Sequence, residues 1–438
     1  MTERNVSLDK VRSKISKIVG DGKVKIDSKV PNKIIVRPRT SDDVSRIINV
    51  AVKEGVPIVP KRKITWAEKG AKTQESIILD TLDMNGIFKI DDENLAVTVG
   101  PGVLGKDLYD TLLKKGYLLG AYPVSSTPTV GEWVDIGGAG IGSYGHGFAG
   151  DLIRTMEVVL PDGKIINTGF EKVLSNSSGY NLNGLFVGAD STLGIITKIT
   201  MKIFPKPEET RPLYYTFSEL KNLTLALQDI TKQKTTPINI LFFDANHIQY
   251  LRKFGKDVPN IEGYVMNITL AGLKSVVDHE EGVINAMMER HGGKKESNDT
   301  AKALWQERFF EVSSTKKEVM PVFYEALIPT TKLFDMANST YSLIDKMKLK
   351  AAVMGILCDR STVNLIPYIM TDKKAIEKPS AFAGKFGELA LANRGRPTGI
   401  TMSQISVIKT VYGEGLNTIL DIKSAIDPRG IMNPSKLS

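Results

Sequence analysis

The hydrophobic and polar positions of the first 207 residues predict short strands and helices that alternate. Residues 44–52 carry apolar side chains at helical spacing, and they follow the capping sequence Ser41-Asp42-Asp43. A second helix is expected at residues 104–115, and strands are expected at residues 33–37, 56–59, 77–80, 95–99, 156–160, 164–167 and 192–203. Such alternation of short elements is typical of an α+β fold.

The second half of the chain alternates in the same way with longer elements. Strands are expected at residues 213–217, 239–243, 263–271 and 351–369, with helices from Ser218, over 276–291 and over 403–426. This order resembles a split β-α-β layer. Pro205-Lys206-Pro207 ends the first unit, and residues 208–211 read as a link. We therefore predict domains at residues 1–207 and 208–402, and a segment 403–438 that returns to the first domain.

Residues 120–150 differ from their surroundings because glycine recurs there at very short intervals. Such density indicates turns with positive φ, or backbone pressed against something flat or charged. A flexible linker is the alternative interpretation. However, Trp133, Val134, Ile136 and Ile141 are too apolar for a solvated linker. We therefore expect this stretch to belong to a binding site.

Composition and charge narrow the class of protein. The 438 residues are 42% hydrophobic and 24% charged, which suits a globular chain of about three units. The single cysteine, Cys358, excludes a disulfide scaffold and a cysteine-bound cluster within this chain. The net charge of +9 could attract an anionic partner, but the lysines are scattered and no nucleic-acid-binding signature accompanies them. With no signal-peptide core or transmembrane run, a cytoplasmic protein is expected.

Three co-linear motifs carry a resemblance to a known family. Residues 78–87 read Ile-Leu-Asp-Thr-Leu-Asp-Met-Asn-Gly-Ile and precede Val-Thr-Val-Gly-Pro-Gly-Val at 97–103. The second motif runs from Ser125 through the glycines to Gly147, with Glu-Val-Val-Leu-Pro-Asp-Gly at 157–163, and the third spans residues 180–197. Together with the Asp-Pro-Arg-Gly-Ile-Met-Asn-Pro tail at 427–434, they resemble the FAD-binding fold of the vanillyl-alcohol oxidase / p-cresol methylhydroxylase (PCMH) family. The branch that is most similar is that of the glycolate oxidase D-subunit and D-lactate dehydrogenase.

This resemblance implies a fold and an activity. Residues 1–207 would form a PCMH-type FAD-binding domain of two α+β subdomains, followed by a ferredoxin-like α+β cap domain that binds substrate. The chain would be an FAD-linked oxidoreductase that oxidises a small, anionic organic substrate. Electrons would pass to a separate acceptor, such as a redox partner subunit or an electron carrier. The oligomeric state is left open, a homo-oligomer included.

The resemblance also implies which residues hold FAD. A diphosphate needs inward-facing N–H groups and small residues that let the chain approach. The implied cofactor residues are Lys61, Arg62, Lys63, Thr65, Ser125, Ser126, Thr127, Gly131, Gly137, Gly140, Ser143, His146, Gly147, Gly194, Ile195, Ile196 and Thr197. Strand 194–197 could instead be ordinary core, and His146 could be a packing residue. No histidine occurs in residues 57–76, where relatives with covalent flavin carry theirs, so FAD is expected to be non-covalent.

The chain departs from the family at several functional positions. The first phosphate loop, glycine-rich in relatives, reads Pro-Lys-Arg-Lys-Ile-Thr-Trp at 60–66, so either basic side chains neutralise the phosphates or FAD binding is weakened. Glu132 and Ser191 stand where relatives have glycine. The histidine motifs of the hydroxy-acid branch are reduced to Asp359 in 356–363 and lost in 395–401. This loss argues against the branch's usual base and against a metal site.

Arg394, Arg396 and Tyr368 remain as candidate catalytic or substrate-binding residues, with Asp359 and Arg360 beside them. Solvated arginines are the alternative for Arg394 and Arg396. Two other functions stay open: a non-catalytic subunit of a larger redox complex, and a binder of an anionic ligand without redox chemistry.

Overall fold

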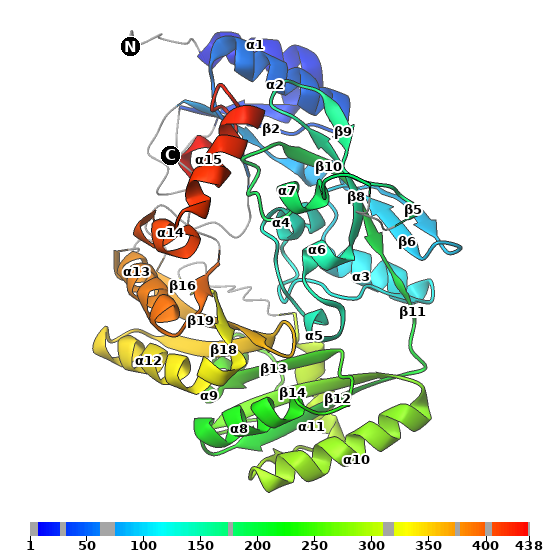
Figure 1. Cartoon of the computed structure of the whole chain (residues 1–438), viewed down its shortest axis with the longest axis vertical. Coiled ribbons are helices and arrows are strands. Elements are labelled where there is room, and N and C mark those ends of the chain that lie inside the picture. Colours follow the sequence, from blue (N-terminus) through cyan, green and yellow to red (C-terminus); the bar gives the residue numbers. More distant parts are fainter. Residues whose placement is uncertain are drawn as a thin grey trace.

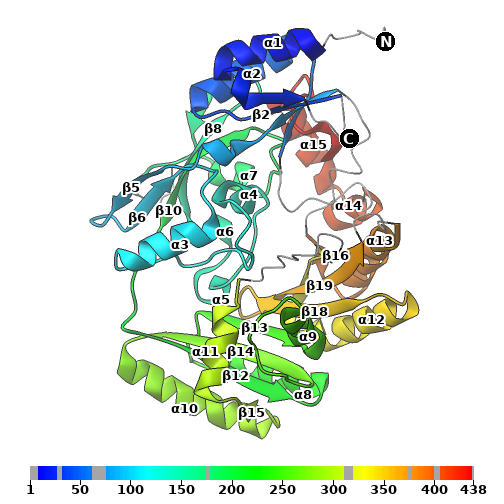
Figure 2. The ribbon, with the colours of Figure 1, turned by 180° about the vertical axis from the view of Figure 1, so that it is seen from behind.

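The computed structural model describes residues 8–26, 32–61, 75–173, 178–309, 319–372, 377–398 and 405–436. Figures 1 and 2 show one lobe built from the first half of the chain and a second lobe below it, built around a large sheet. Helices α13, α14 and α15 follow one side of the molecule from the second lobe to the first. The mixed α+β architecture expected from the sequence is confirmed.

A four-stranded sheet with order β1-β2-β4-β3 forms the first subdomain. Its strands and helices are α1 (Leu8–Val19), β1 (Val24–Ile26), β2 (Lys33–Val36), α2 (Ser41–Glu54), β3 (Ile58–Pro60) and β4 (Ser76–Leu79). Helix α2 buries Val44, Ile47 and Ile48 against this sheet, as its spacing predicts. Its cap is Thr40, whose hydroxyl accepts from the Asp43 N–H, one residue earlier than expected.

An antiparallel five-stranded sheet with order β5-β6-β10-β8-β9 forms the second subdomain. Its strands are β5 (Ile87–Asp91), β6 (Ala96–Val99), β8 (Ile153–Val159), β9 (Ile165–Asn167) and β10 (Ile195–Lys202), with the short pair β7 (Tyr117–Leu118) and β11 (Phe204–Pro205). The helices are α3 (Gly105–Lys114), α4 (Val130–Asp135), α5 (Ser143–His146), α6 (Ala149–Leu152) and α7 (Asn183–Phe186). The glycine-rich stretch is therefore folded into short helices and turns, which excludes the linker interpretation.

The second lobe is built on a nine-stranded sheet with the path β15-β12-β14-β13-β18-β19-β17-β20 and β16 paired to β19. The strands are β12 (Glu209–Phe217), β13 (Asn239–Asp244), β14 (Tyr264–Gly272), β15 (Lys294–Lys295), β16 (Val319–Phe323), β17 (Ala326–Pro329), β18 (Ala351–Leu357), β19 (Thr362–Asp372) and β20 (Arg396–Pro397). One face packs under α8 (Leu220–Ile230), α10 (Lys274–Arg290), α12 (Leu333–Lys346) and α13 (Glu377–Ala392). The other face packs against α9 (Ala245–Lys253), α11 (Asn298–Gln306) and, through Val124, the first lobe.

Two expectations for this lobe are wrong. Residues 208–211 are not a link, because β12 begins at Glu209 and pairs with β14 along its whole length. The predicted strand over 351–369 is two strands, since Asp359 accepts hydrogen bonds from the Ser361 and Thr362 N–H groups and turns the chain.

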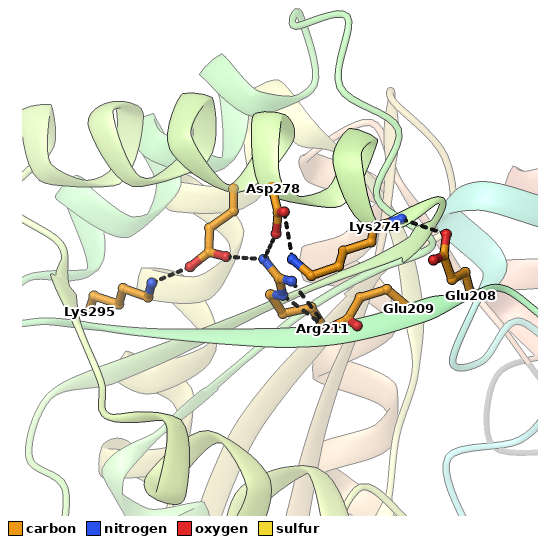
Figure 3. A network of polar contacts seen from close by, with 7 residues as sticks. Glu208, Glu209, Arg211, Lys274, Asp278 and Lys295 are labelled. Atoms are coloured by element: carbon orange, nitrogen blue, oxygen red, sulfur yellow. Dashed lines mark hydrogen bonds and ion pairs between the residues drawn. The ribbon is translucent and has the colours of Figure 1, made fainter.

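Helix α10 is held on the sheet by a network of charges around Arg211 (Figure 3). The guanidinium of Arg211 lies 2.7 Å from Asp278 and 2.6 Å from Glu281 of α10, and 3.2 Å from Glu209 of its own strand. Lys274 and Lys295 extend the network through Asp278 and Glu281. The network is partly exposed, so it adds modestly to the packing of α10.

Replacing Arg211 by methionine should lower the Tm by about 2 °C at low ionic strength, and the loss should shrink as salt is added. Calorimetry in a salt series measures this. Arg46→Met is the matched control, because Arg46 lies 3.9 Å from Asp42 in an exposed pair and should change the Tm little. Equal losses in the two variants would contradict the role assigned to Arg211.

The helical region predicted over 403–426 holds two helices, α14 (Ile405–Tyr412) and α15 (Gly415–Ile426), and residues 403 and 404 lie outside the described residues. Ile422 and Ile426 pack against the core of the second subdomain. These contacts support the predicted return of the segment to the first domain, although the domain boundaries themselves stay a prediction. Within the described ranges, no helix combines the length and the apolar character needed to cross a bilayer.

Candidate functional site

A small cavity, called the first cavity below, lies where the two subdomains of the first lobe meet. It is lined by Pro60, Lys61, Leu79, Thr81, Pro101, Gly131, Glu132, Asp135, Ser191, Ile195 and Ile196. Four of these are predicted cofactor residues: Lys61, Gly131, Ile195 and Ile196. The cavity measures about 30 Å³, enough for one or two water molecules. The structure thus brings part of the predicted cofactor set together around one space.

Lys61 is the cation at this cavity, and its position is set by Asp80. The Lys61 Nζ and the Arg37 Nε each lie 2.8 Å from Asp80 Oδ2, and the Asp80 side chain is 3% exposed. Burial by itself would raise the pKa of Asp80, but the hydrogen bonds from Lys61 and Arg37 outweigh it and hold the pKa below its ordinary 3.8. Asp80 thus holds Lys61 at the cavity, whose lining also contains the carboxylates of Glu132 and Asp135.

Replacing Asp80 by asparagine should lower the free energy of unfolding by about 2 kcal/mol at pH 7, because two cations lose a buried anionic partner. Since the folded pKa is depressed, this stabilisation is fully present above the ordinary value of 3.8 and is lost as pH falls through the folded value. The difference between wild type and Asp80→Asn should therefore shrink below about pH 4. Urea titrations at several pH values measure it, with the exposed Asp162→Asn as control; a difference that persists at low pH would contradict the assignment.

The predicted cofactor glycines pack against other parts of the protein. Four of the five donate their N–H groups to protein acceptors: Gly131 to Pro101 O, Gly137 to Val134 O, Gly140 to Ser143 Oγ and Gly147 to Ser143 O. A Cβ on Gly131 would lie 2.5 Å from Pro101 Cβ, and one on Gly140 would lie 2.0 Å from Tyr122 O. The expectation that these N–H groups face a diphosphate is not met in this structure. Close packing between backbone segments of the protein therefore accounts for these glycines.

Glu132 and Ser191, which stand where relatives have glycine, line the first cavity and each make contacts that hold the local backbone. Glu132 forms a capping box with Thr129 at the start of α4, with an oxygen 2.8 Å from the Thr129 N–H. Ser191 donates to Asp135 from its N–H at 2.8 Å and from its hydroxyl at 2.6 Å. Asp190 and Ser191 have φ of 56° and 55°, a region that costs about 1 kcal/mol or more for a residue with a side chain. The Asp135 contacts hold this strained turn in place.

The remaining predicted cofactor residues that the structure describes are not among those that line the first cavity. The Ser125 and Thr127 hydroxyls are 3.0 Å apart beside Ser126, and the Thr197 hydroxyl donates to Glu157. Gly194 packs against Val158. The His146 ring lies 4.3 Å from the Phe204 ring, its Nε2 is buried without a partner, and burial lowers its pKa. A cofactor contact of His146 stays a prediction. Arg62, Lys63 and Thr65 lie outside the described residues.

The three predicted catalytic residues do not form one site. Tyr368 has no exposed surface and its hydroxyl lies 3.1 Å from His247 Nδ1, inside the packed face of the sheet. Arg394 and Arg396 are exposed at the edge strand β20, which matches the solvated alternative. Arg360 is not a pocket residue, because its guanidinium donates to the carbonyls of Thr231, Gln233 and Thr235. A substrate role for Arg394 and Arg396 stays a prediction.

Sequence reasoning missed Arg308, which lines a second cavity between the lobes. This cavity measures about 20 Å³ and is bounded by Val124, Tyr214, Leu241, Phe243, His247, Leu251, Leu304, Glu307, Arg308 and Met354. The Arg308 guanidinium lies over the rings of Trp305, Phe309 and Tyr109 at 4.7, 4.8 and 5.4 Å. Burial opposes its charge, but the hydroxyls of Tyr122 and Tyr109 outweigh this and raise the pKa of Arg308. Its Nε donates to Tyr122 Oη at 3.2 Å.

Arg308 has no ion-pair partner among the residues that the structure describes. The neighbouring Glu307 pairs with Lys256 at 2.8 Å instead. The guanidinium is held by aromatic rings, by the Tyr122 phenol and by the Trp305 carbonyl, to which Nη1 donates at 2.9 Å. Without a carboxylate, it keeps its charge available for an anion. The sequence offers one local sign of it: an arginine in the apolar run Leu304-Trp305-Gln306-Glu307-Arg308-Phe309.

Comparisons with known proteins agree with this geometry. Residues 32–169 match the family model described as "FAD binding domain", and residues 206–437 match "FAD linked oxidases, C-terminal domain". The chain is 28% identical to the glycolate oxidase subunit GlcD of Bacillus subtilis, covering 92% of this chain and 88% of that protein. It is 26% identical to a D-lactate dehydrogenase of Archaeoglobus fulgidus, covering 93% of this chain and 91% of the relative.

Solved structures share the fold at low sequence identity. A 4-ethylphenol oxidase from Gulosibacter chungangensis matches with a TM-score of 0.81 and 17% identity, over 100% of this chain and 99% of that one. A p-cresol methylhydroxylase matches with a TM-score of 0.78 and 18% identity, over 99% of this chain and 98% of the other. The PCMH-type resemblance read from the motifs is thereby confirmed.

The residues of the first cavity fit FAD. Strand β10 borders the cavity at Ile195 and Ile196, whose side chains pack into the cores of the two subdomains, so the strand backbone can face a ring system, and Gly131 borders it without a side chain. Lys61 adds a positive charge on the opposite wall. With one family model covering more than half of its length, the chain belongs to the FAD-linked oxidases.

Proposed function

We propose that this protein is an FAD-dependent dehydrogenase that oxidises a small organic anion between its two lobes and passes the electrons to a separate carrier. The observation that carries the proposal is Arg308, a charged side chain in the interlobe cavity whose guanidinium has no ion-pair partner among the described residues, since the carboxylate of Glu307 pairs with Lys256. A carboxylate of a substrate would supply that partner, with two parallel N–H···O bonds that orient it.

The rest of the chain supports this assignment. FAD, when bound, supplies the acceptor for the electron pair, and the protein supplies orientation and electrostatics. The named relatives act on glycolate and lactate, which are small 2-hydroxy acids with one carboxylate. This chain lacks the branch's histidine motifs, so another group would have to accept the hydroxyl proton. Its one cysteine, Cys358, is buried, so a redox partner protein must hold any cysteine-bound cluster.

Anaerobic mixing tests the proposal directly. Purified protein loaded with FAD is mixed with glycolate, D-lactate or the uncharged 1,2-propanediol, and the visible flavin absorbance is followed. We expect the acids, and not the diol, to bleach the flavin, because only the acids can pair with Arg308. Equal bleaching by the diol would contradict recognition of an anion. A protein that neither carries nor takes up FAD would favour the alternative of a non-catalytic subunit.

A further inference from the structure

The C-terminal residues 427–436, called the tail below, join the two walls of the first cavity. On one wall, the Ile58 N–H donates to Ile431 O and the Asn433 N–H donates to Ile58 O, both at 2.8 Å, so the tail adds to the edge of β3 just before Pro60 and Lys61. On the other wall, Asn433 Nδ2 donates to Asp190 O at 2.7 Å, beside Ser191. The tail therefore touches the residues that precede the cavity lining on both sides.

A buried ion pair fixes the start of the tail. Lys423 of α15 and Asp427 form an ion pair in which the two side chains are 12% and 1% exposed. The Lys423 ammonium also donates to Thr192 O at 2.7 Å and to Met432 O at 2.9 Å. Asp427 in turn accepts from the N–H groups of Ile431 and Met432. Because a buried ammonium needs all of its acceptors, the tail and the Asp190–Thr192 turn are expected to move as one unit.

Three residues of this unit have a left-handed backbone conformation. Asp190, Ser191 and Asn433 all have positive φ, at 56°, 55° and 41°, although none is glycine. Lys436 adds a contact of 2.7 Å to Asp190. Strained turns persist where surrounding contacts over-determine them, so loss of the tail contacts would let the Ser191 wall relax.

The position of the tail matters because the first cavity is where FAD is expected to bind. The tail holds both walls of this cavity, so its docking bears on how FAD enters and leaves the site. We propose that the tail is a latch for the cofactor: its docking on Ile58 and on the Asp190–Thr192 turn sets how tightly and how slowly FAD exchanges. Lys423 and Asn433 are its positioning residues. By linkage, FAD binding must stabilise the docked tail to the same extent.

Two variants separate this role from general stabilisation. Lys423→Met removes the ammonium that reaches Thr192, and Asn433→Gly removes the bond to Asp190 while glycine accepts the positive φ. Lys14→Met is the control, because it breaks an ion pair with Glu54 on α1 and α2, and neither residue lines the first cavity. The FAD dissociation constant is measured by titrating flavin-stripped protein, and amide hydrogen exchange of residues 427–433 is measured with and without FAD.

We expect both tail variants to weaken FAD binding about tenfold, the control to leave it unchanged, and FAD to slow exchange in the wild-type tail. Unchanged dissociation constants with a lower Tm in flavin-stripped protein would show a structural brace and overturn the latch. A wild-type chain that takes up no FAD would also overturn it. The inference rests on FAD binding and not on the proposed substrate, so failure of the acids to bleach the flavin would leave it standing.

Discussion

Replacing Arg308 by methionine should lower the rate at which glycolate or D-lactate reduces the bound flavin by about 100-fold or more, because a bidentate charge-assisted pair is lost. Methionine keeps most of the side-chain volume against Trp305, Phe309 and Tyr109, so the fold should persist. Stopped-flow reduction under anaerobic conditions gives the rate and its dependence on substrate concentration. FAD content should not change, since Arg308 does not line the first cavity.

Two further variants test whether the loss of rate is specific to the guanidinium of Arg308. Arg308→Lys retains the charge but not the planar pair of donors, so it should recover part of the loss. Arg252→Met on α9 removes an exposed arginine of the same lobe and should have no effect. If Arg308→Met reduced the flavin with glycolate and D-lactate as fast as the wild type does, recognition of the anion would have to be sought elsewhere.

Elements whose cause is local were predictable from the sequence. Helix α2 carries its cap, its apolar stripe and its final Gly55 within one short stretch, and its cap was expected one residue too late. The division between β18 and β19 also has a local cause, the turn built by the Asp359 carboxylate, and an Asp-Arg-Ser sequence could have indicated it. The start of β12 at Glu209 could not be seen locally, because it depends on pairing with residues of β14 far along the chain.

The residues of the candidate site depend even more on contacts between distant parts of the chain, which the sequence does not show. Lys61 was expected among the cofactor residues and lines the first cavity, but its partner Asp80 belongs to a motif read only for its family likeness. Tyr368 looked available because it is polar, whereas pairing of β19 on both sides places it in the core. Arg308 acquires its role from Tyr122, 186 positions away, and from aromatic rings of both lobes. No spacing rule connects residues that only the fold brings together.

Gly142→Ala should test what the glycine-rich stretch is for, and we expect a loss of at least about 3 kcal/mol in the free energy of unfolding. Gly142 has φ of 91°, and a Cβ there would lie 2.0 Å from Gly120 O, a backbone atom with little freedom to move. Its N–H also donates to Asn239 Oδ1 of the second lobe at 3.3 Å. The loss should appear in flavin-stripped protein, because the colliding atoms belong to the chain.

A graded series makes the outcome decisive even if Gly142→Ala does not fold. Gly137 has φ of 64° but its nearest neighbour would be 3.4 Å from a Cβ, so Gly137→Ala should cost about 1 kcal/mol. Gly282 is exposed in α10 with open space around it, so Gly282→Ala should be neutral or stabilise by up to about 1 kcal/mol. Urea unfolding with and without FAD orders the three variants. If Gly137→Ala weakened FAD binding strongly while leaving the stability of flavin-stripped protein unchanged, these glycines would serve the cofactor rather than the packing of the backbone.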